Sequence, residues 1–122
     1  MRTLLDLTIE GDPVPKARPR STRSGHTYTP KRTVDAETVI RNLAAEQVTE
    51  PYDGPVGVSL AFSCATARRT DGDNLQKLVL DALNKVVYTD DHLVHEWSGA
   101  LVRKSATPQT RIVVYTLEPE EA

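Results

Sequence analysis

The sequence contains a single cysteine, Cys64, so an internal disulfide and a four-cysteine metal site are both excluded. No stretch approaches the roughly 18 consecutive apolar residues of a membrane-spanning helix. The N-terminal segment MRTLLDLTIEGD also lacks the long apolar core of a secretory signal. These shortages predict a cytoplasmic protein with no membrane partner.

Aromatic residues are scarce too, at 5%, but the chain is 39% hydrophobic and 26% charged. This composition is typical of a globular protein and argues against intrinsic disorder. A length of 122 residues suits one domain with its own core and is short for two. We therefore expect a single domain over residues 1–122.

Charge is distributed unevenly along the chain. Residues 13–34 hold six cations and no acid, so the rest of the chain carries −8 within a net charge of −2. A basic segment on an acidic body indicates local contact with a polyanion rather than a uniformly basic surface.

Hydrophobic periodicity predicts four strands and two helices. An alternating pattern or a short apolar run indicates strands over residues 4–10, 56–64, 92–104 and 110–118. A pattern with helical period covers residues 34–48. The strongest helical pattern is a stripe formed by Leu75, Leu78, Val79, Ala82, Leu83 and Val86.

The order β-α-β-α-β-β predicts an α+β domain with two layers, in which a mixed sheet of about four strands packs against two main helices. We expect the last two strands to form a hairpin and residues 11–32 to form a long loop. Thr33 or Asp35 is expected to cap the first helix. Asp73, with Gln76 three residues later, is expected to cap the second.

Acidic residues flank this second helix on both sides. Asp71 and Asp73 precede it, separated by a glycine, and the adjacent pair Asp90 and Asp91 follows it. In an extended segment, carboxylates at positions i and i+2 point the same way, and hard oxygen ligands suit Mg²⁺ or Mn²⁺. Asp91 can supply a third carboxylate, either to its own chain or to a partner subunit. Such an ion activates water and neutralises the transition state of phosphodiester hydrolysis.

Lys77, one turn into the helix, can bring an ammonium group near these carboxylates, with Asp81 at i+4 to orient it. Each feature also has an ordinary structural explanation. Asp71 and Asp73 can simply cap a helix, Lys77 and Asp81 can form a surface pair, and Asp90 and Asp91 can lie in a turn. The combination around one helix favours the metal site.

The segment DGDNLQKLVLDALNKVVYTDD closely resembles the signature of the RusA family of Holliday junction resolvases, and PVPKARPR resembles the N-terminal segment of that family. The resemblance spans roughly residues 9–104. It implies a RusA-like fold and a homodimeric, Mg²⁺-dependent endodeoxyribonuclease of bacteria or phages, which nicks opposing strands of four-way junction DNA symmetrically in recombination and repair. Asp71, Asp73, Asp91 and Lys77 match the catalytic positions, and Asp71, Asp73, Asp91 and Asp90 match the metal-binding positions.

The resemblance also gives the basic residues a role, since cations that contact phosphates bind DNA with strong salt dependence. The candidate DNA-binding residues are Lys16, Arg18, Arg20, Arg23, Lys31, Arg32, Arg68 and Arg69. His26 and Tyr28 can stack on an opened base or anchor the loop. Trp97 is expected in the core or in a dimer interface rather than at the DNA.

Two other functions are compatible with the residues. The chain can be a non-catalytic nucleic-acid-binding module that uses the basic N-terminal loop, with the acids serving structure. It can also be an unrelated metal-dependent phosphotransfer enzyme for small nucleotides, although the sequence has no GxxxxGK[ST] phosphate loop.

Overall fold

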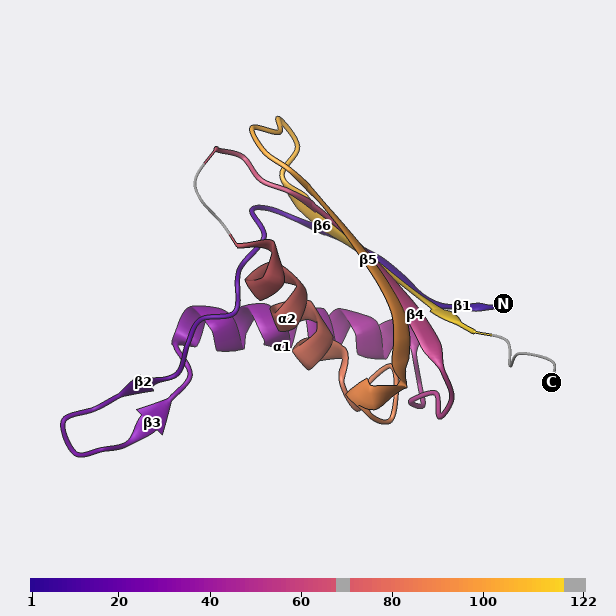
Figure 1. Ribbon diagram of the computed structural model, residues 1–122, viewed down its shortest axis with the longest axis horizontal. Helices are drawn as coiled ribbons and strands as arrows, with labels where there is room; N and C mark the ends of the chain where they lie inside the picture. Colours follow the sequence, from indigo (N-terminus) through magenta and orange to yellow (C-terminus); the bar gives the residue numbers. More distant parts are fainter. Residues whose placement is uncertain (68–70, 118–122) are drawn as a thin grey trace.

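A computed structural model describes residues 1–67 and 71–117. Two helices cover one face of a twisted four-stranded sheet, and a small two-stranded sheet projects away from this body (Figure 1). The elements in chain order are β1 (Thr3–Glu10), β2 (Arg20–Ser21), β3 (Thr27–Tyr28), α1 (Lys31–Gln47), β4 (Val56–Ser63), α2 (Gly72–Leu83), the 3₁₀ turn η1 (Asp91–Leu93), β5 (Val94–Val102) and β6 (Gln109–Thr116). The predicted α+β fold with a mixed sheet and two main helices is confirmed.

The strand order in the main sheet is β1-β6-β4-β5. β6 lies between β1 and β4 and is antiparallel to both, whereas β5 pairs with β4 in parallel. The expected hairpin of the last two strands is therefore wrong, because β4 separates them. Parallel neighbours need a crossover connection, which here contains α2, and β5 is left at the edge.

The burial of the two strands explains this order. β6 alternates buried positions with partly covered or exposed ones, and its apolar residues Ile112 and Val114 are fully buried. β5 carries only partly buried or exposed residues along its length. The exposed strand therefore occupies the edge, where its polar and small residues cost little.

The core lies between the sheet and the helices. The predicted apolar stripe of α2 is confirmed, since all its members within the helix are at most 2% exposed. The inward residues of β4, from Val56 to Phe62 in steps of two, are buried as expected, and so is Cys64 directly after the strand. The remaining large members of the core include Leu5, Leu7, Ile40, Val87, Tyr88, Ile112 and Val114.

The N-terminal part of α1 differs from the prediction. The helix begins at Lys31, its N-cap residue is Pro30, and no side chain caps it. Thr33 lies inside the helix and is buried, and its hydroxyl accepts a hydrogen bond from the Ala17 amide at 3.2 Å. The Thr33 side chain thus holds the preceding segment onto α1 instead of capping the helix.

The basic segment is also more ordered than the predicted loop. β2 and β3 form a small antiparallel hairpin. We call residues 13–28, which include this hairpin, the basic arm. Its turn closes through the Thr22 amide, which donates to the His26 carbonyl, and Gly25 there adopts a φ of 87°. A positive φ favours glycine, so this residue permits the reversal.

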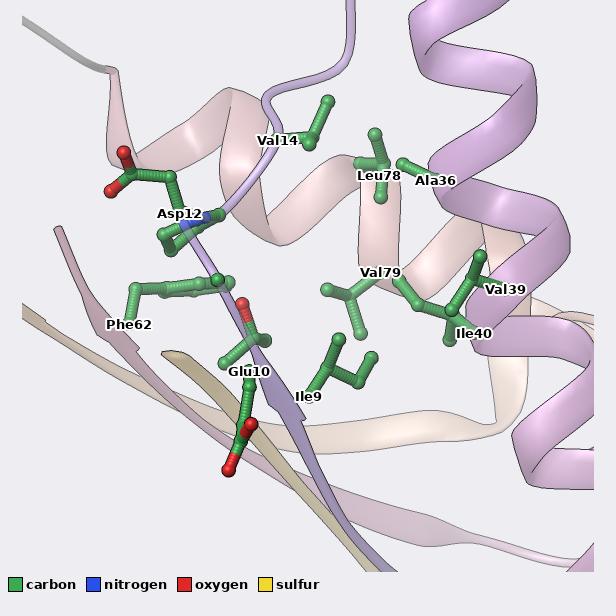
Figure 2. A pocket seen from close by; sticks show the side chains of 13 residues that line it. Ile9, Glu10, Asp12, Val14, Ala36, Val39, Ile40, Phe62, Leu78 and Val79 are labelled. Atoms are coloured by element: carbon green, nitrogen blue, oxygen red, sulfur yellow. The ribbon is translucent and has the colours of Figure 1, made fainter. Parts of the chain in front are cut away.

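An apolar cavity of about 260 Å³ lies where the end of β1 meets both helices. Figure 2 shows Ile9, Ile40 and Val79 converging on it from β1, α1 and α2, while the carboxylate of Glu10 points away. None of the described acidic residues in or around α2 lines this cavity. The cavity borders the basic arm at Val14.

Gly57 on β4 provides a first prediction. A Cβ placed there would lie 2.3 Å from ring atoms of Tyr115, whose hydroxyl donates to Glu96 at 3.1 Å. We expect Gly57→Ala to lower the free energy of unfolding by about 1–3 kcal/mol, because the ring must move and lose this bond. Urea denaturation measures the loss. Gly72→Ala is the control, since a Cβ there meets nothing within 4 Å, and an equal loss in both variants would contradict the explanation.

Candidate functional site

The N-terminus of α2 brings the first two acids to the surface. Asp71, not Asp73, is the N-cap residue, and its Oδ1 accepts a hydrogen bond from the Asp73 amide at 3.0 Å. The predicted cap at Asp73 is therefore wrong by two residues. The consequence is that Asp73 lies in the first turn of the helix, where its exposed carboxylate is not needed as the cap and is favoured by the helix dipole.

The chain returns directly after α2. The helix ends at Leu83, and Lys85 has a φ of 67°, a left-handed conformation that reverses the direction of the backbone. The Lys85 amide donates to the Tyr88 carbonyl at 2.8 Å, and the buried Tyr88 hydroxyl donates to the Leu80 carbonyl at 2.8 Å. This compact return carries Asp90 and Asp91 back alongside α2.

Acidic residues of α2 and of the segment that follows it line one hollow of about 440 Å³ between α2 and the start of β5. We call it the acidic hollow. Its walls include Asp73, Lys77, Asp81 and Asp91 of the same chain, together with Gln76, Leu80, Val94 and Trp97. Asp71 and Asp90 adjoin these residues in sequence but do not line the hollow.

The carboxyl groups of Asp90 and Asp91 shift each other's pKa values in opposite directions. A hydrogen bond with Asp90 raises the pKa of Asp91, and burial and the negative charges of Asp90 and Asp81 raise it further. The same bond lowers the pKa of Asp90, with additional contributions from His92, whose Nδ1 lies 3.5 Å from the Asp90 carboxylate. Several carboxylates crowded in this way favour either a shared proton or a bound cation.

The oxygen donors at the acidic hollow are of the kind that Mg²⁺ prefers. Within residues 1–67 and 71–117, no three carboxylate, histidine or cysteine side chains are close enough together to hold a metal ion by themselves. Mg²⁺ commonly binds through one or two carboxylates while waters and substrate phosphates complete its coordination. Asp73 and Asp91 provide two such carboxylates at one hollow, so the residues are compatible with this ion.

Lys16 links the basic arm to the acidic hollow. Its Nζ lies 2.7 Å from Glu37 on α1 and 3.3 Å from Asp81 on α2, and its amide donates to the Asn74 carbonyl at 2.8 Å. Burial alone would lower the pKa of Lys16, but the hydrogen bonds to Glu37 and Asp81 outweigh it and raise the pKa. Asp81, expected to orient Lys77, thus forms its ion pair with Lys16.

A second prediction concerns this link. Lys16→Met is expected to lower the free energy of unfolding by about 1 kcal/mol, because it leaves the Glu37 side chain, only 12% exposed, without this cation. The contribution is fully present at neutral pH, since the pKa of Lys16 is raised, and is lost only as the pH rises above 10.5.

Thermal or urea unfolding of the variant at pH 7 measures this contribution. Lys31→Met is the matched control, because the Lys31–Asp35 pair is solvent-exposed and should contribute little. Equal stability of the Lys16 variant and the wild type would show that the link is energetically neutral.

The other proposed DNA-binding residues that the structure describes are more exposed than Lys16. Arg18, Arg20, Arg23, Lys31 and Arg32 are exposed on the basic arm and the first turn of α1. Arg68 and Arg69 lie outside the described residues. Lys16, in contrast, is partly buried between two carboxylates, and its contact with DNA stays a prediction.

Sequence reasoning did not place Trp97 or Gln76 in a site. Trp97 is 59% exposed and lines the acidic hollow, so of its two expected positions the core is wrong, while the dimer interface stays a prediction. No pattern in the sequence predicts this exposure, which follows from the position of β5 at the edge of the sheet. Gln76 is one turn after Gly72, on the side of α2 that faces β5.

The acidic hollow and the basic arm are joined through Lys16, and the exposed cations of the arm suit a polyanion. The model of the family described as endodeoxyribonuclease RusA matches residues 10–115, nearly the whole chain. The chain therefore belongs to the RusA family, which indicates an endodeoxyribonuclease of the Holliday junction resolvase class. No curated protein sequence gives a significant match. No helix in the described part of the chain has the length and apolar character to cross a membrane.

Proposed function

We propose that the protein is a Mg²⁺-dependent endonuclease that resolves four-way DNA junctions by paired, symmetric nicks, in recombination and repair. The observation that supports this most strongly is the acidic hollow, where Asp73 and Asp91 of one chain lie with Lys77, in a member of the RusA family. Mn²⁺ is expected to substitute for Mg²⁺, since both prefer carboxylate oxygens and waters.

Asp73 and Asp91 are the proposed ligands, with Asp71 and Asp90 adjoining them. The bound ion would activate water and neutralise charge at the scissile phosphate. Lys77 would place its ammonium group toward that phosphate and stabilise the developing negative charge. Asp71 in addition fixes the first turn of α2 through its cap, and so positions Asp73.

The basic arm is the proposed contact for the arms of the junction. Its exposed arginines can neutralise phosphates, and Lys31 and Arg32 lie in the first turn of α1, where the helix dipole adds positive potential. Phosphate contacts position DNA without reading its sequence, which suits recognition by shape. Lys16 would fix the basic arm relative to α2 through its ion pair with Asp81 and its hydrogen bond to the Asn74 carbonyl.

We further propose a homodimer, because two symmetric cuts on opposing strands require two active sites related by a two-fold axis. The main sheet ends in the edge strands β1 and β5. The Gln47 side chain already bonds to the amide and the carbonyl of Asp6 on β1, so β5 is the edge that a second copy can extend. Light scattering at several protein concentrations tests this, and a mass of one chain throughout would contradict it.

The function is tested by incubating the protein with a synthetic four-way junction or with a linear duplex of the same sequence, in Mg²⁺ or in EDTA. We expect paired nicks, which ligase can seal, in the junction and only with Mg²⁺. Tight binding of the junction without cutting at any Mg²⁺ or Mn²⁺ concentration would instead support a non-catalytic binding module.

A further inference from the structure

Trp97 is the most exposed aromatic side chain in the part of the chain that the structure describes, and its position sets it apart from an ordinary surface residue. It lies on β5 opposite Val58 of β4, with Gly99 two residues further along opposite Leu60. Val58 and Leu60 are buried under the helices, so Trp97 and Gly99 share the sheet face that carries the helix layer.

A second hollow, of about 360 Å³, adjoins the acidic hollow at this face. Asp73, Gln76 and Trp97 line both hollows, which makes the two continuous along α2. The second hollow has no carboxylate besides Asp73, and its remaining walls are Phe62, Gly72 and residues 98–101 of β5. One end of this surface is therefore acidic and the other is aromatic and neutral.

The neutral end offers the two kinds of contact that a nucleobase uses. The indole of Trp97 is a flat surface on which a base can stack. The Oε1 of Gln76 lies 3.5 Å from the point where a Cβ of Gly99 would be, so the amide reaches over a floor that has no side chain. A glutamine amide can both donate to and accept from the edge of a base.

We propose that Trp97 and Gln76 form a nucleobase subsite, in which Trp97 stacks on an unpaired base beside the scissile phosphate and the Gln76 amide hydrogen-bonds to its edge. This inference rests on the proposed function, which positions the phosphate at Asp73, Asp91 and Lys77. The base attached to that phosphate then enters the adjoining hollow. The subsite gives the enzyme a preference among bases that phosphate contacts cannot provide.

Trp97 is the only tryptophan in the chain, so its fluorescence reports directly on this subsite. The wild-type protein is titrated with a four-way junction in Ca²⁺, with a gel to check that the DNA stays intact. We expect the junction to quench the emission, and a linear duplex to quench it less. Emission that is unchanged by saturating junction, but shifts when the protein alone is diluted, would overturn the proposal in favour of a contact between two copies.

Variants separate stacking from packing. Trp97→Phe retains an aromatic ring, whereas Trp97→Leu retains apolar volume and cannot stack. We expect Trp97→Leu to weaken cutting of the preferred junction about 5- to 100-fold, mainly through KM, and Trp97→Phe to keep most of it. Equal cutting by the leucine variant and the wild type would overturn the proposal. The fold is checked by circular dichroism.

The amide is tested with a panel of junctions that differ in the bases flanking the cut. Gln76→Ala should flatten the preference among them while the protein still cuts, and an unchanged preference would remove Gln76 from the subsite. If the wild type cuts no junction, the proposed function fails. The fluorescence titration still decides whether Trp97 contacts a base, so the two failures are distinguishable.

Discussion

Asp73→Asn is expected to reduce junction cutting at least about 100-fold while junction binding is retained or becomes tighter. The substitution removes a proposed metal ligand and a charge that stabilises the reacting phosphate through that metal. It also removes a negative charge that repels DNA phosphates, which is why binding should not weaken. Initial rates of nicking and the midpoint of a gel-shift titration, at one salt concentration, measure the two effects separately.

The matched control is Glu46→Gln, which makes the same change in charge at an exposed position near the end of α1. It should cut at the wild-type rate. The Asp73 carboxylate does not cap α2, so its loss should leave the helix intact, whereas Asp71→Ala would also remove the cap. Cutting by Asp73→Asn at the wild-type rate would mean that the acidic hollow is not the active site.

Leu75→Ala is expected to lower the free energy of unfolding by about 2–5 kcal/mol, the largest effect on stability that we predict. Leu75 is 0% exposed and lies on the buried stripe of α2, two residues after Asp73. Its truncation leaves a cavity between α2 and the sheet. For a small domain this loss is a large share of the total stability.

Urea denaturation at equilibrium measures the change, and Val39→Ala serves as the control. Val39 is also apolar and helical, but it is 47% exposed at the border of the apolar cavity, so we expect a loss below about 1 kcal/mol. If both truncations cost the same, the helix layer does not pack on the sheet as described.

The apolar patterns predicted most of the fold because they reflect which faces are buried. The stripe of α2 and the alternation of β1 and β4 are local properties, and each is confirmed. The pairing of β5 and β6 is not local. Proximity in sequence favoured a hairpin, but β6 lies between β1 and β4, where its alternate residues Ile112 and Val114 are fully buried on one face of the sheet.

The candidate site was predictable where spacing along one helix determines it. Asp73 and Lys77, four residues apart on α2, line the same hollow. The position of Asp91 at this hollow depends on the chain reversal at Lys85. Lys85 is a non-glycine residue with positive φ, a conformation that no sequence pattern predicts here. The pairing of Lys16 with Asp81, 65 positions away, likewise depends on how the basic arm lies across the helices.

Asp73 and Asp91 of one chain are the proposed ligands of the metal ion needed to cut the junction. The most direct test is an Mn²⁺ titration followed by electron paramagnetic resonance, with the wild type, Asp73→Asn, Asp91→Asn and Glu46→Gln. We expect each of the two aspartate variants to bind Mn²⁺ at least about 10-fold more weakly, and Glu46→Gln to bind it as the wild type does. The same Mn²⁺ affinity in all four proteins would contradict this assignment.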